Sequence, residues 1–340
     1  MSLLEVRHLS TSFFTPAGEV RAVNDLSFSL EEGETIGIVG ESGSGKSVTA
    51  YSIMQILTHP GRIIGGSIKY DGEELVGCTD KTISSIRGNK ISMIFQDPMT
   101  SLNPVYTVGN QLEEAIMLHT KRDKAQSRKR AVEMIRLVGI NDPDKRVRQY
   151  PHELSGGMRQ RVMIAMALAC EPNILIADEP TTALDVTIQA QILELMKALQ
   201  QQLGLAIILI THDLGVVAGM CESVLVMYAG KIIERGSAED IFYNPKHEYT
   251  KGLLRSLPSI GSDKENERLI PIAGTPVDML MLPAGCAFLP RCDRAMKICI
   301  YETPEELGIN EGHYASCWQN VKALLQADEL PEHQIEESRE

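Results

Sequence analysis

Short apolar runs and longer helical repeats alternate along the chain, and this pattern predicts an α/β protein. Apolar, β-branched runs bounded by glycine or charged residues predict strands, and they lie at residues 3–6, 25–30, 35–39, 68–70, 93–95, 174–177, 205–210 and 223–227. Apolar residues that recur every three or four positions predict helices. One helix begins near residue 47, and others cover 108–139, 160–169 and 188–203. Strands that alternate with helices through right-handed crossovers build a mostly parallel sheet.

A change of composition near residues 258–267 predicts a domain boundary. Proline, serine, glycine and charged residues replace the periodic pattern there. We therefore expect one domain over residues 1–257 and a small, irregular, cysteine-rich C-terminal domain over 258–325. Residues 326–340 are polar and acidic, which predicts a flexible tail.

The overall composition is that of a soluble globular protein. Of the 340 residues, 43% are hydrophobic and 23% are charged, as in ordinary domains. No apolar run approaches the roughly 18 to 20 residues that cross a bilayer, and the N-terminus lacks the apolar core of a signal peptide, so we expect an intracellular protein. The net charge of −12 opposes general nucleic-acid binding, and the basic run 121–130 is typical of a solvated helix face.

A glycine-rich segment between the strand at 35–39 and the next helix matches the phosphate-binding pattern G-x-x-x-x-G-K-S/T in full. Its residues are Gly40, Glu41, Ser42, Gly43, Ser44, Gly45, Lys46 and Ser47. Glycines let backbone N–H groups converge on phosphate oxygens, and the helix N-terminus adds the positive end of its dipole. Lys46 supplies a positive charge to the phosphates, the Ser47 hydroxyl is suited to Mg²⁺, and Val48 completes the predicted nucleotide-binding segment.

Two acidic residues follow the apolar strand at 174–177 and complete the pattern of a magnesium–nucleotide site. Asp178 is expected to hold Mg²⁺, directly or through water, and Glu179 to polarise the attacking water. Paired acids after a strand can instead begin a helix, as acidic residues often do. Together with the phosphate loop, however, the pair indicates nucleotide hydrolysis.

Further motifs, in a fixed order, resemble those of ATP-binding cassette (ABC) proteins. The signature sequence of that family is matched by Leu154-Ser155-Gly156-Gly157-Met158-Arg159-Gln160-Arg161. Gln96 resembles the Q-loop glutamine, residues 183–185 the D-loop and His212 the switch histidine. Phe13 lies where an adenine-stacking aromatic residue is expected, and Phe14 is the second choice. The resemblance implies a P-loop NTPase fold with an inserted helical subdomain at about 97–160.

The same resemblance implies that the protein hydrolyses ATP with Mg²⁺ and assigns a role to each motif. The implied catalytic residues are Lys46, Gln96, Glu179 and His212, and the implied Mg²⁺ ligands are Ser47, Gln96 and Asp178. Ser155, Gly156, Gly157 and Asp185 are implied to contribute to a nucleotide site, with the signature residues reaching the γ-phosphate held by a second cassette.

Three segments narrow the resemblance to the ATPase subunits of dipeptide and oligopeptide importers, a subfamily shared with nickel importers. They are residues 97–104, 243–250 and the cysteine-rich end, with one departure at Glu248, where the family usually has proline. The resemblance implies a peripheral protein on the cytoplasmic face of the cell membrane. Its implied partners are two membrane-spanning permease subunits, contacted through residues 99–108, and, indirectly, an extracytoplasmic substrate-binding protein; no nucleic acid is implied. A second ATPase subunit is also implied, for which the resemblance favours a related chain over another copy of this one.

Four of the seven cysteines fall within 32 residues and predict a metal site in a reducing compartment. Cys286, Cys292, Cys299 and Cys317 are separated by five, six and seventeen residues. Structural zinc sites prefer two close pairs, whereas four thiolates on irregular backbone suit a 4Fe–4S cluster. The importer subfamily, in which such clusters occur, points the same way. Zinc and four reduced thiols stay open as alternatives.

Two other functions remain compatible with these motifs. The chain could energise a nickel importer, because ATPase subunits do not line the translocation path. It could also be a soluble cassette protein that acts on ribosomes or DNA, but such proteins usually carry two cassettes or a long coiled coil in one chain, and neither is visible in this sequence.

Overall fold

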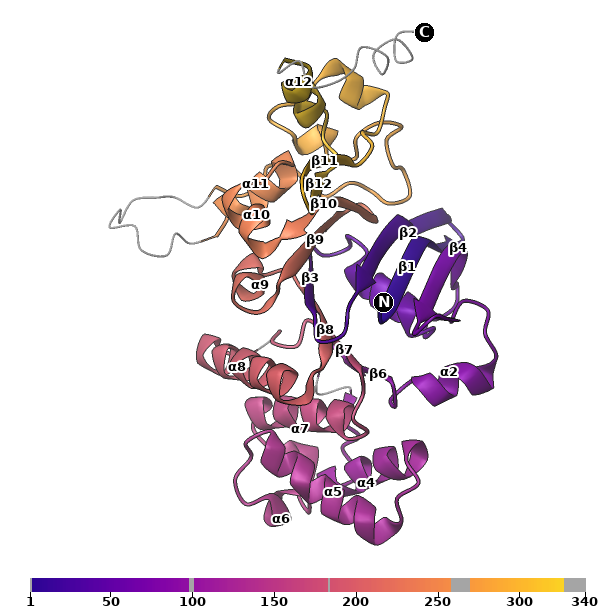
Figure 1. Cartoon of the computed structure of the whole chain (residues 1–340), viewed down its shortest axis with the longest axis vertical. Coiled ribbons are helices and arrows are strands. Elements are labelled where there is room, and N and C mark those ends of the chain that lie inside the picture. The colour runs from indigo at the N-terminus through magenta and orange to yellow at the C-terminus, as the bar shows by residue number, and fades with distance from the viewer. Residues whose placement is uncertain (1, 98–100, 183, 258–269, 327–340) are drawn as a thin grey trace, which may run out of the picture.

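The computed structural model describes residues 2–97, 101–182, 184–257 and 270–326, and they form three regions along one long axis (Figure 1). Helices α4 to α7 lie at one end, two sheets occupy the middle, and the C-terminal extension lies at the other end. Within these described ranges, no helix combines the length and the apolar character needed to cross a membrane.

The larger sheet is the centre of the fold and has eight strands in the order β11-β12-β10-β9-β3-β8-β7-β6. The five strands from β9 to β6 run parallel. Every residue of β3, β7 and β8 is buried, which explains why they were recognisable as continuous apolar runs. The strand bounds are β3 Thr35–Val39, β6 Ile91–Ile94, β7 Ile174–Asp178, β8 Ala206–Thr211, β9 Ser223–Tyr228, β10 Lys231–Ser237, β11 Leu307–Asn310 and β12 His313–Ala315.

A separate four-stranded antiparallel sheet, β2-β1-β4-β5, contains the N-terminal strands, which the sequence analysis did not distinguish from those of the mostly parallel sheet. Its strands are β1 Leu4–Thr15, β2 Gly18–Leu30, β4 Gly61–Tyr70 and β5 Glu73–Glu74. The short apolar runs in the sequence marked only parts of these strands, because their outer faces are polar and exposed. A hairpin lets β1 and β2 pair directly, without a crossover helix.

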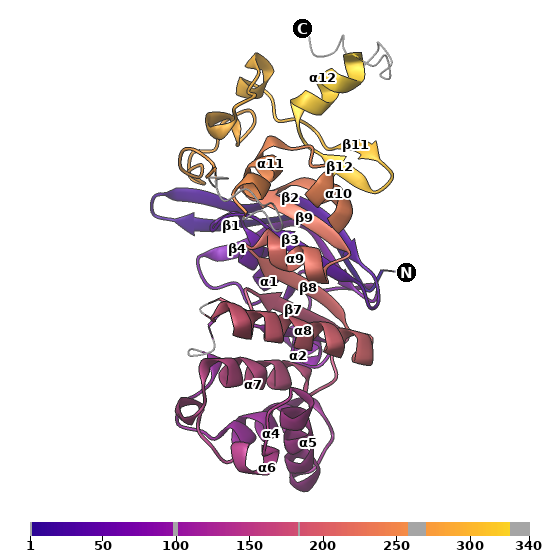
Figure 2. The ribbon, with the colours of Figure 1, turned by 90° about the vertical axis from the view of Figure 1, so that its left-hand side faces the viewer.

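Helices cover the parallel sheet, and α8 lies between it and the helical end of the molecule (Figure 2). Their bounds are α1 Lys46–Ile53, α2 Asp80–Ile86, α4 Val108–His119, α5 Lys124–Leu137, α6 Pro143–Arg146, α7 Gly156–Leu168, α8 Val186–Leu203, α9 Leu214–Met220, α10 Ala238–Tyr243, α11 Glu248–Arg255 and α12 Trp318–Gln326, with single 3₁₀ turns at Pro151–Glu153, Leu289–Arg291 and Lys297–Ile300.

The helical stretch predicted over 108–139 is two helices, α4 and α5. Asp123 starts the second with a reciprocal capping box, in which its carboxylate accepts the N–H of Gln126 (2.8 Å) and the Gln126 side chain accepts the N–H of Asp123 (3.0 Å). A capping box of this kind marks the start of a new helix. Together with α6 and α7 these helices lie at one end of the molecule, and α7 ends at Leu168, beyond the limit of about 160 predicted for a helical subdomain.

The C-terminal extension is more regular than expected. Strand β12 pairs with β10 through Glu234 opposite Ala315 and Arg235 opposite Tyr314, so the extension continues the main sheet. Strand β12 is short and includes the buried His313. No alternation of apolar and polar residues is therefore visible in its sequence. The expected boundary at 258–267 and nearly all of the acidic tail lie outside the described residues.

His247 is a buried histidine at the start of α11, next to the C-terminal extension. It is buried and caps α11 by accepting the N–H of Tyr249 on Nδ1 (3.0 Å), and burial lowers the pKa of His247 to about 4. Because an unfolded histidine titrates near 6.5, only the unfolded chain gains this proton between those values, and stability falls as the pH decreases through that range.

We therefore expect His247 to remove about 2 kcal/mol of unfolding free energy between pH 7.5 and 5. Asparagine caps helices well and does not titrate, so His247→Asn is the matched variant. Denaturant unfolding at both pH values should show a smaller loss in the variant. Equal losses in the two proteins would contradict this assignment.

Candidate nucleotide site

The phosphate loop links the end of β3 to the start of α1 and depends on glycine at defined points. Gly45 lies immediately before the helix with a φ of +105°, in the region that favours glycine. A Cβ atom on Gly45 would lie 2.3 Å from the backbone oxygen of Ala22. Strand β2 therefore packs directly against the loop and leaves no room for a side chain at this position.

Gly45→Ala should cost about 2 kcal/mol or more in unfolding free energy and should weaken ATP binding, because it combines a left-handed backbone with a steric clash. Gly43→Ala is the matched control, since Gly43 also has a positive φ, +78°, but a Cβ atom there meets nothing within 4 Å. We expect a cost of only about 1 kcal/mol for the control. Denaturant unfolding measures both, and equal costs would contradict the role of the Ala22 contact.

Lys46 is buried, and its ammonium group occupies the loop itself. Nζ donates hydrogen bonds to the backbone oxygens of Gly40 (2.7 Å) and Glu41 (2.9 Å). Burial lowers the pKa of Lys46, while the carboxylates of Glu179, Asp178 and Glu41 act in the opposite direction. The loop therefore holds a buried cation, which can form charge-assisted hydrogen bonds with an anionic group.

Ser47 and Asp178 meet at the edge of the sheet, as the sequence predicted. The Ser47 hydroxyl donates a hydrogen bond to Asp178 Oδ1 (2.9 Å). Asp178 is fully buried, and its Oδ2 makes no hydrogen bond with any described residue. Burial raises the pKa of Asp178, although the Ser47 hydrogen bond opposes this shift. A hydroxyl beside an unsatisfied buried carboxylate oxygen is a donor set that fits Mg²⁺.

Glu179 is the meeting point of three motifs. Gln96 Nε2 donates to Glu179 Oε2 (2.9 Å), and His212 Nδ1 lies 3.3 Å from Glu179 Oε1. The Thr182 hydroxyl also donates to Oε2 (2.9 Å). The backbone of Glu179 is left-handed, with a φ of +46°, a strained state for a residue with a side chain. The turn after β7 therefore directs this carboxylate toward the groups that follow β6 and β8.

The signature residues and Asp185 lie on other helices. Ser155 caps α7 by accepting the N–H of Met158 (3.4 Å), and both Ser155 and Gly156 are exposed at the start of this helix. Gly157 packs against α8, where an added Cβ would lie 2.8 Å from Ile188. Asp185 caps α8 by accepting the N–H of Ile188 (3.0 Å). Ala183, the first residue of the predicted D-loop, lies outside the described residues.

Phe13 lies on β1, half-buried, with its ring against Gly61. Thr11, two residues earlier and on the same face of the strand, hydrogen-bonds to Ser52 of α1 (2.9 Å). The Phe13 ring is therefore on the side of β1 that faces the helix after the phosphate loop. Phe14 points the other way, and Arg62 stacks over its ring at 4.1 Å.

Two residues missed by sequence reasoning hold the phosphate loop from the C-terminal part of the chain. The Tyr249 hydroxyl accepts the N–H of Glu41 (2.8 Å). Arg291 donates two hydrogen bonds to the Glu41 carboxylate (2.5 and 2.8 Å). More than 200 residues separate these partners, so no local pattern could have indicated the contacts.

The four clustered cysteines gather around one small apolar cavity of about 20 Å³, as their proximity in the sequence suggested. Cys286, Cys292, Cys299 and Cys317 are free thiols. Burial raises the pKa of Cys286 to about 11 and also raises that of Cys292 and Cys317. Among the described residues, no group of three or more side chains is arranged to hold a metal ion. The donor set of four sulfurs nevertheless fits a thiolate-bound metal.

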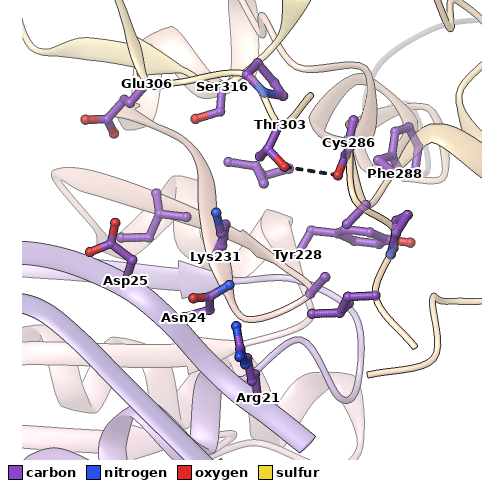
Figure 3. Close-up of a pocket in the computed structure, with 18 of the residues that line it drawn as sticks. Arg21, Asn24, Asp25, Tyr228, Lys231, Cys286, Phe288, Thr303, Glu306 and Ser316 are labelled. Carbon is purple, nitrogen blue, oxygen red and sulfur yellow. Dashed lines mark hydrogen bonds between the residues drawn. The ribbon is translucent and has the colours of Figure 1, made fainter. Parts of the chain in front are cut away.

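A larger cleft of about 1170 Å³ separates the antiparallel sheet from the extension (Figure 3). Arg21, Asn24 and Asp25 line one side, and Cys286 and Thr303 line the other. The Thr303 hydroxyl donates to the backbone oxygen of Gly285 (3.1 Å), which fixes the cysteine segment on that wall. None of residues 40–47 lines the cleft, so it is distinct from the phosphate loop.

A phosphate loop after β3, paired acids at the end of β7 and a histidine after β8 define a P-loop ATPase of the ABC type. The family profile of ABC transporters matches residues 23–182, and that of the oligopeptide/dipeptide transporter C-terminal region matches residues 233–299. These matches, together with the similarity to peptide-transport ATP-binding proteins along nearly the whole chain, show that the chain belongs to the family of ABC transport ATP-binding proteins with an oligopeptide/dipeptide C-terminal region.

The similar proteins match along nearly the whole chain. The oligopeptide transport ATP-binding protein OppD of Salmonella typhimurium is 53% identical over 323 residues, which cover 95% of each chain. The dipeptide transport ATP-binding protein DppD of Bacillus subtilis is 53% identical over 317 residues, covering 93% of this chain and 94% of that protein. A dimeric ATP-binding cassette in a post-hydrolysis state with ADP and Pi superposes with a TM-score of 0.62 at 27% identity, covering 69% of this chain and 98% of the other.

Proposed function

We propose that this protein is the ATP-hydrolysing subunit of an ABC importer that carries dipeptides or oligopeptides across the cytoplasmic membrane. The observation that carries the proposal is the full-length similarity to peptide-transport ATP-binding proteins, which includes the C-terminal region. The geometry supports hydrolysis, because Glu179 lies within hydrogen-bonding distance of Gln96 and near His212.

The proposed reaction is attack of water on the γ-phosphate of ATP. Glu179 accepts the proton of the attacking water, Lys46 leaves its loop carbonyls to bind phosphate oxygens, and His212 stabilises the developing negative charge. Ser47, Asp178 and Gln96 would hold Mg²⁺, which when bound neutralises charge on the phosphates. Phe13 stacks on the adenine, on the face of β1 that looks toward α1.

A second cassette is proposed to complete the site. Ser155 and Gly156 are exposed at the start of α7, where the helix N-terminus favours a negatively charged group. These residues, with Gly157, would approach the γ-phosphate bound to the partner, and Asp185 would lie at the same interface. ATP would then hold the two cassettes together and hydrolysis would release them, which gives a two-state element controlled by the γ-phosphate. The partner is a related chain.

The contact with the two permease subunits is proposed at the loop that precedes α4. In the described part of this loop, Val105 is 71% exposed and Tyr106 is 52% exposed, and exposed apolar residues are typical of binding surfaces. The buried Gln111 fixes the loop, since its Nε2 donates to the backbone oxygens of Asn103 and Tyr106 (3.0 Å each). This contact would place the protein at the cytoplasmic face of the membrane, peripherally bound. Met99 and Thr100 of the predicted contact loop lie outside the described residues.

The cysteine site is proposed to hold a 4Fe–4S cluster through Cys286, Cys292, Cys299 and Cys317. All four line one cavity in the extension, and thiolates are the usual ligands of such clusters. A bound cluster would cross-link the extension, and the thiols must lose their protons to bind it.

Copurification tests the function. The tagged chain is isolated anaerobically from its native membrane, and its partners and absorption spectrum are determined. Two polytopic subunits, a second cassette and broad absorption near about 400 nm would support the importer and the cluster. Ribosomal or DNA-bound partners would contradict the importer, and a colourless complex would contradict only the cluster.

A further inference from the structure

Glu41, the second residue of the phosphate loop, is contacted through both its backbone N–H and its carboxylate by residues from the C-terminal part of the chain. Its backbone N–H donates to the Tyr249 hydroxyl, and its backbone oxygen accepts from Lys46 Nζ. Its carboxylate is held by Arg291, 250 residues later. The first turn of the loop is therefore fixed at three points, two of them supplied by the C-terminal part of the chain.

The buried side chain of Arg291 is held in one position by its hydrogen bonds. Its side chain is only 3% exposed, compared with 27% for Glu41. The guanidinium uses both terminal nitrogens on Glu41, and its Nε donates to the backbone oxygen of Ala273 (3.1 Å). A bidentate arginine–carboxylate pair fixes direction as well as distance, and lysine cannot reproduce it.

An aromatic cluster packs next to Arg291 on the side of the sheet. Tyr228, at the end of β9, packs against Tyr249 (4.7 Å between ring centroids) and against Phe288 (5.4 Å). The Arg291 guanidinium lies 5.9 Å from the rings of Tyr228 and Phe288. Figure 3 shows Tyr228 and Phe288 close together beside Cys286. The cysteine segment, the aromatic cluster and the phosphate loop thus form one continuous packed unit.

We propose that Arg291 is a positioning residue for ATP binding, which acts from the C-terminal extension by neutralising Glu41 and fixing the first turn of the phosphate loop. This inference rests on the proposed nucleotide site. Without Arg291, the Glu41 carboxylate would remain as an uncompensated negative charge in the loop that receives the triphosphate, and like charges repel. The extension would then be required for ATP affinity as well as for its own fold.

The test is isothermal titration of ATP into the purified full-length chain. Arg291→Gln should weaken ATP binding about tenfold, a change of about 1.4 kcal/mol. In Glu41→Gln/Arg291→Gln the unpaired charge is absent, so ATP affinity should return to within about threefold of the parent. A role limited to stabilising the extension would not produce this recovery.

Arg235→Gln is the matched control. Arg235 also joins the main sheet to the extension through a two-nitrogen ion pair, with Glu306 (2.7 Å for both bonds), but Glu306 lies outside the phosphate loop. ATP affinity should be unchanged in this variant. If Arg291→Gln does not fold, Arg291→Lys replaces it, with an expected loss of about threefold because one hydrogen bond is kept.

Three results overturn the inference: parental ATP affinity in the Arg291 variant, an equal loss in the Arg235 variant, or a double variant that binds as weakly as Arg291→Gln. Each requires that the parent binds ATP. A parent that does not bind ATP, with no difference from Lys46→Ala, would instead contradict the proposed function itself.

Discussion

Replacing Glu179 by glutamine should reduce ATP hydrolysis by about a hundredfold or more while ATP binding is retained. Glutamine has nearly the same shape and can still accept the hydrogen bond that Thr182 donates to Oε2, but it cannot take a proton from water. Because ATP is not consumed, the variant mixed with its related partner cassette should accumulate as a closed dimer. Phosphate release measures the first effect, and size-exclusion chromatography with ATP measures the second.

Glu171→Gln is a suitable control for the Glu179 experiment. Glu171 is a surface carboxylate that pairs with Arg130 (3.0 Å) and Arg122 (3.3 Å), and it precedes β7, whose other end leads into Glu179. Its replacement should leave the hydrolysis rate at the parental value. Hydrolysis at the parental rate in Glu179→Gln would show that Glu179 is not the base.

Lys46→Ala should weaken ATP binding by about a hundredfold or more. The ammonium group is the buried cation of the phosphate loop, and removing it leaves the phosphate charge to be balanced by backbone N–H groups alone. The fold should persist, because Nζ contacts only the two loop carbonyls of Gly40 and Glu41 among the hydrogen bonds of the described residues. Titration with ATP measures the affinity, and thermal unfolding confirms that the chain is folded.

Lys197→Ala provides the comparison for Lys46. Lys197 lies on α8 and donates a hydrogen bond to the backbone oxygen of Gly219 (2.9 Å). This hydrogen bond involves none of the motif residues. It should bind ATP as the parent does. If Lys46→Ala also binds ATP with parental affinity, the phosphate loop is not the nucleotide site.

Much of the nucleotide site could be predicted because its signals are local. The phosphate loop, the acids after β7 and the residue after β8 each follow an apolar strand, and the carboxyl ends of parallel strands meet at one edge of the sheet. The contacts of Glu179 with Gln96 and His212 follow from that topology. The residues were therefore found, while their roles in binding and hydrolysis stay predictions.

What could not be predicted depends on pairing between distant segments. Strand β1 pairs with β4 across more than 45 residues, and only the folded backbone sets that register. Arg291 and Tyr249 reach Glu41 across more than 200 residues. An arginine in an irregular, cysteine-rich segment looks like any surface cation in the sequence, and its burial becomes visible only when the extension packs against the loop.

The cysteine site lies between these two cases. Four cysteines within 32 residues predicted a common site, and the structure places all four around one cavity. The identity of a metal depends on the charge and spacing of the sulfurs, and the described side chains do not form a ready metal geometry. The 4Fe–4S cluster therefore remains a prediction for the absorption spectrum to test.

ATP-driven uptake tests the central claim most directly. The copurified complex is reconstituted in vesicles with its substrate-binding protein, and entry of a labelled oligopeptide is measured with ATP supplied on the side of the cassettes. We predict uptake that requires ATP and is lost when the chain carries Lys46→Ala. ATP hydrolysis without peptide uptake, or uptake of Ni²⁺ in place of peptide, would contradict the account.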